Sequence, residues 1–222
     1  MSVYTKVTHK DLVAFLSDYS VGKLLSFEGI SDGIENTNYF VTTEQGKFVL
    51  TLFEQHEFDE MGYFLEVMTF FFENGIPSAH PKADKKGRYL KMLSNKPAAI
   101  VQRLDGRGVC DVASVGQCQA IGGVLGRMHV AGLQFGRRHT TQRGGRWRQQ
   151  KAEKLLPLLG STAAKIMSDE LRFQAGYGEL NLPFGLTHSD LFRDNALFDG
   201  DELKGIIDFY YACDEYLIYD LA

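Results

Sequence analysis

The stretch that decides the fold is His188-Ser189-Asp190-Leu191-Phe192-Arg193-Asp194-Asn195, followed closely by Ile206-Ile207-Asp208-Phe209. Between the two, apolar runs at 196–198 and 203–209 flank Asp199-Gly200-Asp201-Glu202, a turn sequence typical of a hairpin. A loop from Asp190 to Asn195 can direct both side chains toward one cleft. The hairpin then returns the chain so that Asp208 reaches the same place. We therefore predict that these three side chains converge.

The three converging side chains carry the oxygen atoms that phosphoryl transfer needs. A carboxylate must orient the attacking hydroxyl and accept its proton, and oxygen ligands must hold the Mg²⁺ that neutralises the phosphates. The alternative is structural: His188 and Asp190 form a polar turn and Asp208 caps a strand, because D-x-x-x-x-N spacing often arises by chance.

Residues 1–103 have the pattern of one small sheet with helices. Thr8 and Asp11 predict a capped helix that ends near Tyr19. Later apolar segments predict a three-stranded meander, a buried helix stopped by Gly75 and two more strands, at 23–30, 38–44, 47–54, 57–74, 88–93 and 97–104. Five strands with a helix after the third are typical of the N-terminal lobe of a kinase-like fold.

After the turn-rich residues 104–108, helical periodicity dominates the chain up to about residue 171. One predicted helix, 114–132, places an apolar stripe on one face and glycines that allow a neighbour to approach, namely Val115, Cys118, Ile121, Leu125 and Met128, with Gly122, Gly123 and Gly126. An arginine-rich stretch around Trp147 favours a solvated loop or subunit contact over a phosphate or nucleic-acid site. A further helical region is expected from about 148 to 171.

These patterns predict an α+β fold of the protein kinase-like, two-lobe kind. Its N-terminal lobe would be an antiparallel five-stranded sheet with an inserted helix, and its C-terminal lobe would be mainly helical. The expected domains are a nucleotide-binding lobe at 1–103 and a catalytic lobe at 104–222.

Composition limits the possible settings of the protein. The 222 residues are 44% hydrophobic, and a formal charge of −4 lacks the basic excess of a nucleic-acid binder. Three cysteines without a C-x-x-C pair indicate a reducing, cytoplasmic location. Signal-peptide and membrane-spanning patterns are missing from the sequence, and its histidines lack compact metal-ligand spacing. We expect no membrane or nucleic-acid partner.

The pattern H-x-D-x-x-x-x-N with a later Asp resembles the catalytic loop and metal-binding Asp of the protein kinase-like superfamily, in the form found in aminoglycoside phosphotransferases, choline kinases and homoserine kinases. The segments 73–106 and 122–138 are similar to homoserine kinases, and the resemblance covers nearly all of the chain. It implies ATP and Mg²⁺ as cofactors. It also implies L-homoserine as the acceptor, converted to O-phospho-L-homoserine in threonine biosynthesis.

The resemblance also implies roles for residues of the catalytic loop. Asp190 would be the catalytic base, and Asn195 and Asp208 would be the Mg²⁺ ligands. His188 and Asp220 would brace the loop. Two roles remain open for a further loop residue, Arg193: stabilising charge on the transferred phosphoryl group or forming a bracing ion pair.

For the nucleotide, the loop between the first two strands would cover the phosphates. Gly33 would permit close backbone approach, and Ser31, Asn36 and Asn38 would donate hydrogen bonds. An ordinary hairpin loop with Asx turns is the alternative. Backbone groups near Val101, Gln102 and Arg103 would hold adenine.

The third predicted strand departs from kinases at large. It carries Thr51 where kinases place a lysine, and Lys47 lies on the same face but displaced along the strand. Glu66 stands where the partner glutamate of the helix is expected, or is an ordinary solvated helix residue. The VLTLFE sequence around Thr51 is similar to that of homoserine kinases, so another donor is expected to meet the phosphates.

The last residues, YLIYDLA, stop within an apolar pattern that resembles the start of a helix. This indicates a chain truncated at its C-terminus, with low solubility or weak turnover as the expected result. Three alternatives to a homoserine kinase stay open: a kinase for another small alcohol (an aminoglycoside, choline or a sugar), a non-catalytic nucleotide-binding module, and a metal-dependent phosphate-ester hydrolase. The oligomeric state is undetermined.

Overall fold

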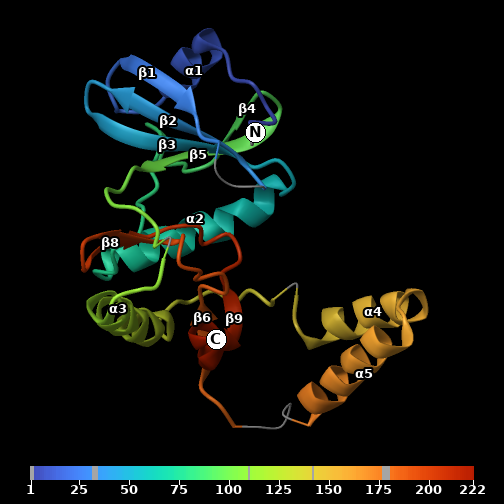
Figure 1. Ribbon diagram of the computed structural model, residues 1–222. Helices are drawn as coiled ribbons and strands as arrows, with labels where there is room; N and C mark the ends of the chain where they lie inside the picture. Colours follow the sequence, from blue (N-terminus) through green and yellow to red (C-terminus); the bar gives the residue numbers. More distant parts are fainter. Residues whose placement is uncertain (1–2, 32–34, 110, 142, 177–180) are drawn as a thin grey trace.

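The computed structural model describes residues 3–31, 35–109, 111–141, 143–176 and 181–222, which form an α+β fold (Figure 1). Its helices are α1 (His9–Leu16), α2 (Phe58–Glu73), α3 (Val115–Gly132), α4 (Gly145–Leu155) and α5 (Ser161–Ala175), with 3₁₀ turns at Leu156–Leu158 and Leu217–Leu221. Its strands are β1 (Leu24–Gly29), β2 (Thr37–Thr43), β3 (Gly46–Leu52), β4 (Lys91–Leu93), β5 (Lys96–Gln102), β6 (Phe184–Thr187), β7 (Ala196–Asp199), β8 (Glu202–Ile206) and β9 (Cys213–Tyr216).

The N-terminal sheet has five antiparallel strands in the order β1-β2-β3-β5-β4, which confirms the predicted meander and its two later strands. Burial alternates along β2, as expected of a strand with one covered face. Thr8 caps α1 by accepting a hydrogen bond from the backbone N–H of Asp11, as predicted. The helix packs on one face of this sheet (Figure 1).

Helix α2 lies between the sheet and the C-terminal elements (Figure 1). Its apolar residues cover most of its circumference, and seven of its side chains are buried: Met61, Tyr63, Phe64, Leu65, Val67, Met68 and Phe71. The helix stops at Glu73, and Gly75 follows with a φ of +74°, a left-handed conformation that glycine adopts without strain. The predicted Gly stop is confirmed.

Two hydrophobic clusters form the core. One joins α1 to the sheet, whereas the other contains α2 together with Val124, Met128, Ile206 and Phe209 from the C-terminal part. The second cluster therefore crosses the predicted boundary between residues 103 and 104 and fixes the two lobes against each other. The sheet itself ends at Gln102, and the division into two domains stays a prediction.

The linker after the sheet packs against the catalytic segment. Gly106 has a φ of +94°, and a Cβ built there would lie 2.9 Å from the backbone oxygen of Phe198. A Cβ on Gly108 would lie 2.7 Å from the Cα of Asp194. The two glycines thus allow the backbone approach that holds the loop containing Asp194 against the linker.

Helix α3 forms as predicted, but its predicted apolar stripe is only half correct. Leu125 and Met128 are buried, whereas Val115 is 76% exposed and Cys118 is also exposed, because the packed part of the helix is its C-terminal half. The predicted close approach at the three central glycines is wrong as well: a Cβ on Gly122 or Gly126 would meet nothing within 4 Å, and one on Gly123 only the Arg127 side chain at 3.9 Å.

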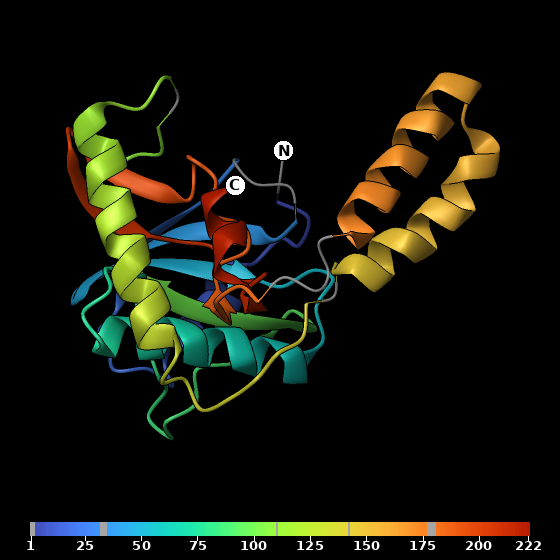
Figure 2. The same cartoon turned by 90° about the horizontal axis from the view of Figure 1, so that it is seen from below.

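Helices α4 and α5 form a hairpin that projects from the rest of the molecule (Figure 2). The continuous helical region expected from about 148 to 171 is in fact two helices, because Pro157 lies in the 3₁₀ turn between them. Helix α5 buries none of its residues. Within the described ranges, no helix has the length and apolar character needed to cross a membrane.

Candidate active site

The catalytic-loop sequence begins where β6 ends, and its last residue, Asn195, is hydrogen-bonded to the residue that follows β8. The N–H of Ile207 donates to the carbonyl oxygen of Asn195 over 3.0 Å. Ser189 and Asp208 both have positive φ angles, 64° and 66°, which non-glycine residues seldom adopt. Such conformations persist only where surrounding contacts enforce them, as at functional sites.

His188 is fully buried and braces the loop, as the resemblance implied. Its Nδ1 accepts the N–H of Asp190 at 3.2 Å, so its Nε2 carries the proton and donates to the carbonyl oxygen of Ile207 at 2.9 Å. Burial lowers the pKa of His188, which agrees with a neutral ring. The histidine therefore connects the loop that contains Asp190 to the segment that contains Asp208.

Asp220 is the second brace, and this prediction is also confirmed. Its carboxylate accepts the N–H groups of His188 and Ser189 over 3.0 and 2.8 Å, and it contacts Nε2 of His129 on α3 at 2.8 Å. The Asp220 side chain is fully buried. A single carboxylate thus fixes the start of the catalytic loop and ties it to α3.

We expect Asp220→Ala to lower the free energy of unfolding by about 3 kcal/mol, because two buried N–H groups lose a charged acceptor. Urea unfolding followed by circular dichroism measures this loss. The matched control, Asp169→Ala, removes an exposed carboxylate on α5 with two surface ion pairs and should cost less than about 1 kcal/mol. Equal losses in the two variants would contradict the bracing role.

Asp190, Asn195 and Asp208 all line one cavity of about 600 Å³. The Nδ2 of Asn195 donates to the backbone oxygen of Asp190 over 2.7 Å and lies 3.4 Å from its Oδ2. The pairing of Ala196 with Ile206 places Asp208 just beyond the same end of the hairpin. The structure therefore brings together the three side chains that the sequence predicted to converge.

Negative charge accumulates in this cavity. Burial, followed by the charges of Asp190, Glu35 and Asp194, raises the pKa of Asp208 to about 6. Burial and the charges of Glu35 and Asp194 also raise the pKa of Asp190. Carboxylates that disfavour one another's ionised form make a favourable environment for a cation.

The predicted phosphate loop is only partly placed at this cavity. Asn36 and Asn38 line it, Ser31 lies outside its lining, and Gly33 lies outside the described residues. Asn36 is 8% exposed, and among the described residues its Oδ1 has no hydrogen-bond partner. Glu35, which the sequence analysis overlooked, lines the cavity beside it.

The three residues expected near adenine lie at the end of β5. The N–H of Gln102 donates to the His80 carbonyl oxygen at 2.9 Å, and that of Arg103 to the Lys47 carbonyl oxygen at 3.1 Å. Both amide donors are therefore used within the protein, and adenine contacts at these residues would have to use other groups. Val101 is buried in the core cluster.

The strand position that lacks a lysine is occupied by a buried hydroxyl. Thr51 donates to Oδ1 of Asn38 over 2.8 Å, which fixes the orientation of that side chain beside the cavity. Lys47 is exposed at the far end of β3. Glu66 pairs with Arg137 on the surface. Of its two predicted roles, that of an ordinary solvated helix residue is therefore the correct one.

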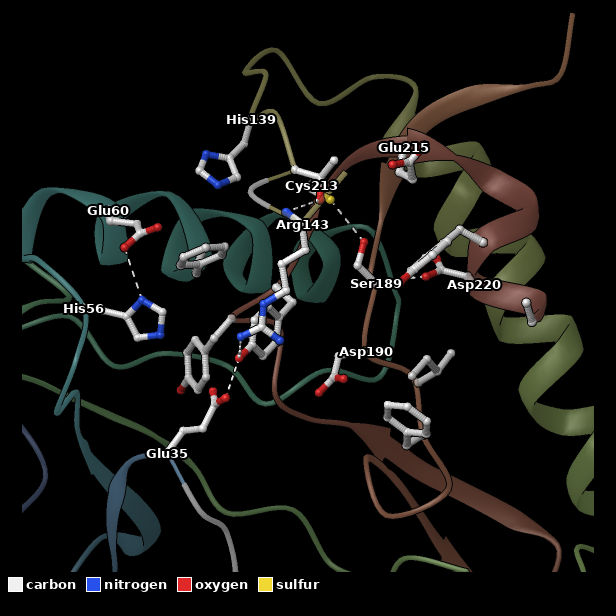
Figure 3. Close-up of a pocket in the computed structure, with 18 of the residues that line it drawn as sticks. Glu35, His56, Glu60, His139, Arg143, Ser189, Asp190, Cys213, Glu215 and Asp220 are labelled. Carbon is white, nitrogen blue, oxygen red and sulfur yellow. Dashed lines mark hydrogen bonds and ion pairs between the residues drawn. The ribbon is translucent and has the colours of Figure 1, made fainter. Parts of the chain in front are cut away.

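A second cavity, of about 700 Å³ (Figure 3), shares Asp190 with the first as part of its lining. His56 and Glu60 line it and pair with each other at 3.1 Å. Arg143 and Tyr211 line both cavities, and the Arg143 Nη2 donates to the Tyr211 hydroxyl over 3.0 Å. Arg143 belongs to the arginine-rich stretch around Trp147, for which the sequence favoured a solvated loop or subunit contact over a phosphate site. The other three were not predicted, because their positions carry no local motif.

Tyr211 also donates to Oε1 of Glu35 over 2.5 Å, which links the predicted phosphate loop to the C-terminal part of the chain. Arg193 lines the first cavity, but its Nη1 donates to the carbonyl oxygen of Asp111 at 2.7 Å. This contact favours the bracing alternative for Arg193, although through a carbonyl and not an ion pair.

A five-stranded sheet joined through a linker to a loop that gathers Asp, Asn and Asp in one cleft defines a protein kinase-like phosphotransferase. The Phosphotransferase enzyme family matches residues 26–222. Homoserine kinases of Methylobacillus flagellatus and Neisseria meningitidis serogroup B are 46% and 39% identical over the whole chain, which spans 69% and 72% of their lengths. The chain belongs to this phosphotransferase family and, within it, to the homoserine kinases.

Solved structures agree on the fold. An amicoumacin kinase bound to AMP-PNP and Ca²⁺ superposes with a TM-score of 0.75 at 19% identity, covering 97% of this chain and 67% of that one. A spectinomycin phosphotransferase bound to ADP and spectinomycin gives a TM-score of 0.68 at 15% identity, covering 98% and 73%. The predicted two-lobe fold is therefore confirmed.

Proposed function

We propose that this chain transfers the γ-phosphoryl group of ATP to the hydroxyl of L-homoserine, giving O-phospho-L-homoserine and ADP in threonine biosynthesis. The observation that carries the proposal is the meeting of Asp190, Asn195 and Asp208 in one cavity. The homoserine kinase relatives, at 39–46% identity, favour homoserine over the other small alcohols as the acceptor.

In this proposal Asp190 is the catalytic base. Asp190 lines both cavities, so in this proposal it meets the phosphates in the 600 Å³ cavity, which Asn36 and Asn38 also line, and the hydroxyl in the 700 Å³ cavity, the acceptor-side cavity. The hydrogen bond from Asn195 orients the carboxylate of Asp190, and His188 holds its backbone N–H. Its raised pKa makes it a better proton acceptor than an ordinary aspartate.

Asn195 and Asp208 would hold Mg²⁺, which supplies charge neutralisation on the phosphates when bound. The raised pKa of Asp208 and the carboxylates around it fit a cation at this place. Among the described residues, no group of three or more His, Cys, Asp or Glu side chains is arranged to hold a metal. One carboxylate and one amide suit Mg²⁺, which completes its shell with phosphate oxygens and water.

ATP would lie between the lobes, with its phosphates under the β1–β2 loop. Asn36 and Asn38 line the cavity, and an asparagine Nδ2 can donate to a phosphate oxygen. We retain the division into a nucleotide-binding lobe, 1–103, and a catalytic lobe, 104–222. Ser31, Gly33, Val101, Gln102 and Arg103 stay predicted nucleotide contacts, and a cytoplasmic setting stays a prediction.

The test is ADP release from ATP with L-homoserine, choline, kanamycin and glucose as separate acceptors, with and without Mg²⁺. We expect Mg²⁺-dependent release with homoserine and at least about 100-fold lower kcat/KM with the others. Turnover of another alcohol but not homoserine would contradict the acceptor. ATP binding without any turnover would favour a non-catalytic module, and phosphate release without an acceptor would favour a hydrolase.

A further inference from the structure

The 700 Å³ cavity, which is proposed to receive the acceptor, contains two arginines that form no ion pair with any described residue. Arg143 lies just before α4, and Arg148 lies within it; both line the 700 Å³ cavity that Asp190 also lines. The two arginines that precede them, Arg137 and Arg138, are by contrast paired with Glu66 and Asp214. The cavity therefore holds two guanidinium groups without a carboxylate partner.

Arg148 gives the stronger of the two indications. Its Nε is buried, and among the described residues this N–H has no hydrogen-bond acceptor. A buried donor without a partner is unfavourable, and native structures seldom keep one unless a ligand or water completes it. Arg148 lines only the acceptor-side cavity, whereas Arg143 also lines the cavity assigned to the phosphates. Arg148 therefore points to a group of the acceptor and not of ATP.

The segment that carries the two arginines is anchored to the catalytic part. The N–H of His139 donates to Oδ2 of Asp214, and the N–H of Asp214 donates to the carbonyl oxygen of His139, both over 2.8 Å. The His139 ring stacks on Tyr63 of α2 with centroids 4.6 Å apart. The Arg143 guanidinium lies over the Tyr211 ring at 4.6 Å. These contacts fix Arg143 near the base, and the charge of Arg143 accordingly acts to lower the pKa of Asp190.

The acidic side chains of the same cavity already have partners. Glu35 accepts from Tyr211, Glu60 pairs with His56, Asp220 accepts from the loop, and Glu215 accepts from the N–H of Tyr216. The charged groups of this cavity that lack an ion pair with a described residue therefore include the two guanidinium groups, which a ligand carboxylate would complete. A guanidinium forms two parallel hydrogen bonds with a carboxylate.

We propose that Arg148, together with Arg143, binds the carboxylate of an amino-acid acceptor and so determines acceptor specificity. This inference rests on the proposed phosphoryl transfer to an alcohol. Choline and aminoglycosides are cations and simple sugars are neutral, so none offers the anion that these two residues require. Homoserine carries a carboxylate at one end and the reacting hydroxyl at the other.

The test compares homoserine with 3-aminopropan-1-ol, which is homoserine without its carboxylate. In the wild-type chain, we expect kcat/KM for homoserine to exceed that for the amino alcohol by at least about 100-fold. Arg148→Gln should raise KM for homoserine about 100-fold and leave KM for ATP within about twofold. It should leave kcat/KM for the amino alcohol unchanged. Arg148→Lys keeps the charge but loses the two parallel N–H donors of the guanidinium group, and it should raise KM for homoserine about tenfold.

The matched control is Arg146→Gln, which removes the same charge from an exposed position of α4 outside both cavities. It should behave as the wild type does, and thermal unfolding should be the same for all variants. A raised KM for ATP, or equal effects in Arg146→Gln and Arg148→Gln, would overturn the assignment. If homoserine is not phosphorylated, the proposed function fails. The inference then still requires that the acceptor found in a wider panel be anionic, and a neutral or cationic acceptor overturns it.

Discussion

Replacing Asp190 with asparagine is expected to lower kcat by about 10³- to 10⁴-fold while KM for ATP stays within about twofold. Asparagine has nearly the same shape, and its Oδ1 can still accept from Asn195. It cannot take the proton of an attacking hydroxyl. The loss should therefore appear in kcat, because the missing interaction belongs to the transition state. Steady-state ADP release with saturating homoserine measures it.

A second loop carboxylate provides the control for this experiment. Asp194→Asn removes an equal charge from the same loop but leaves the proton acceptor in place, and we expect it to lower kcat by less than about tenfold. Binding of a fluorescent ATP analogue to Asp190→Asn should match that to the wild type. If Asp190→Asn keeps full turnover, Asp190 is not the base, and the carboxylate contributes only to the structure of the loop.

The catalytic loop could be predicted from sequence because its chemistry is local. Asp190 and Asn195 are five residues apart, and only a two-strand hairpin separates them from Asp208. Local hydrogen bonds then set their geometry, so the spacing alone carried the information. The cap at Thr8 and the stop at Gly75 were predictable for the same reason.

The acceptor-side cavity could not be predicted in this way, because segments distant in sequence build it. Arg148 comes from α4, Glu60 from α2 and Glu215 from β9. Each one by itself resembles an ordinary surface residue. The same limit explains the error about α3, where periodicity identifies one face of a helix but not how far along that face a neighbour extends. At Gly132, a Cβ built on the backbone would lie 3.1 Å from Cβ of Leu186. This close approach is a tertiary contact that the sequence does not signal.

Replacing Asp208 with asparagine is expected to raise the stability of the folded chain at high pH and to lower kcat. The folded-state pKa of Asp208, about 6, lies above the ordinary value of 3.8, so the folded chain holds this proton more tightly than the unfolded chain does. The resulting stability is present below about pH 4 and is lost as the pH rises through 6. Two pKa units correspond to about 3 kcal/mol, an upper estimate for the penalty of ionised Asp208 above pH 7.

We therefore expect Asp208→Asn to unfold about 5–10 °C higher than the wild type at pH 8 without metal, and at nearly the same temperature at pH 4. At pH 8, MgATP should raise the unfolding temperature of the wild type but change that of Asp208→Asn much less, because a ligand stabilises only a state that binds it. The same variant should lose at least about 10³-fold in kcat. A variant less stable than the wild type at pH 8, or equally stabilised by MgATP, would show that Asp208 is a structural residue. Such a result would remove the metal site from the proposed mechanism.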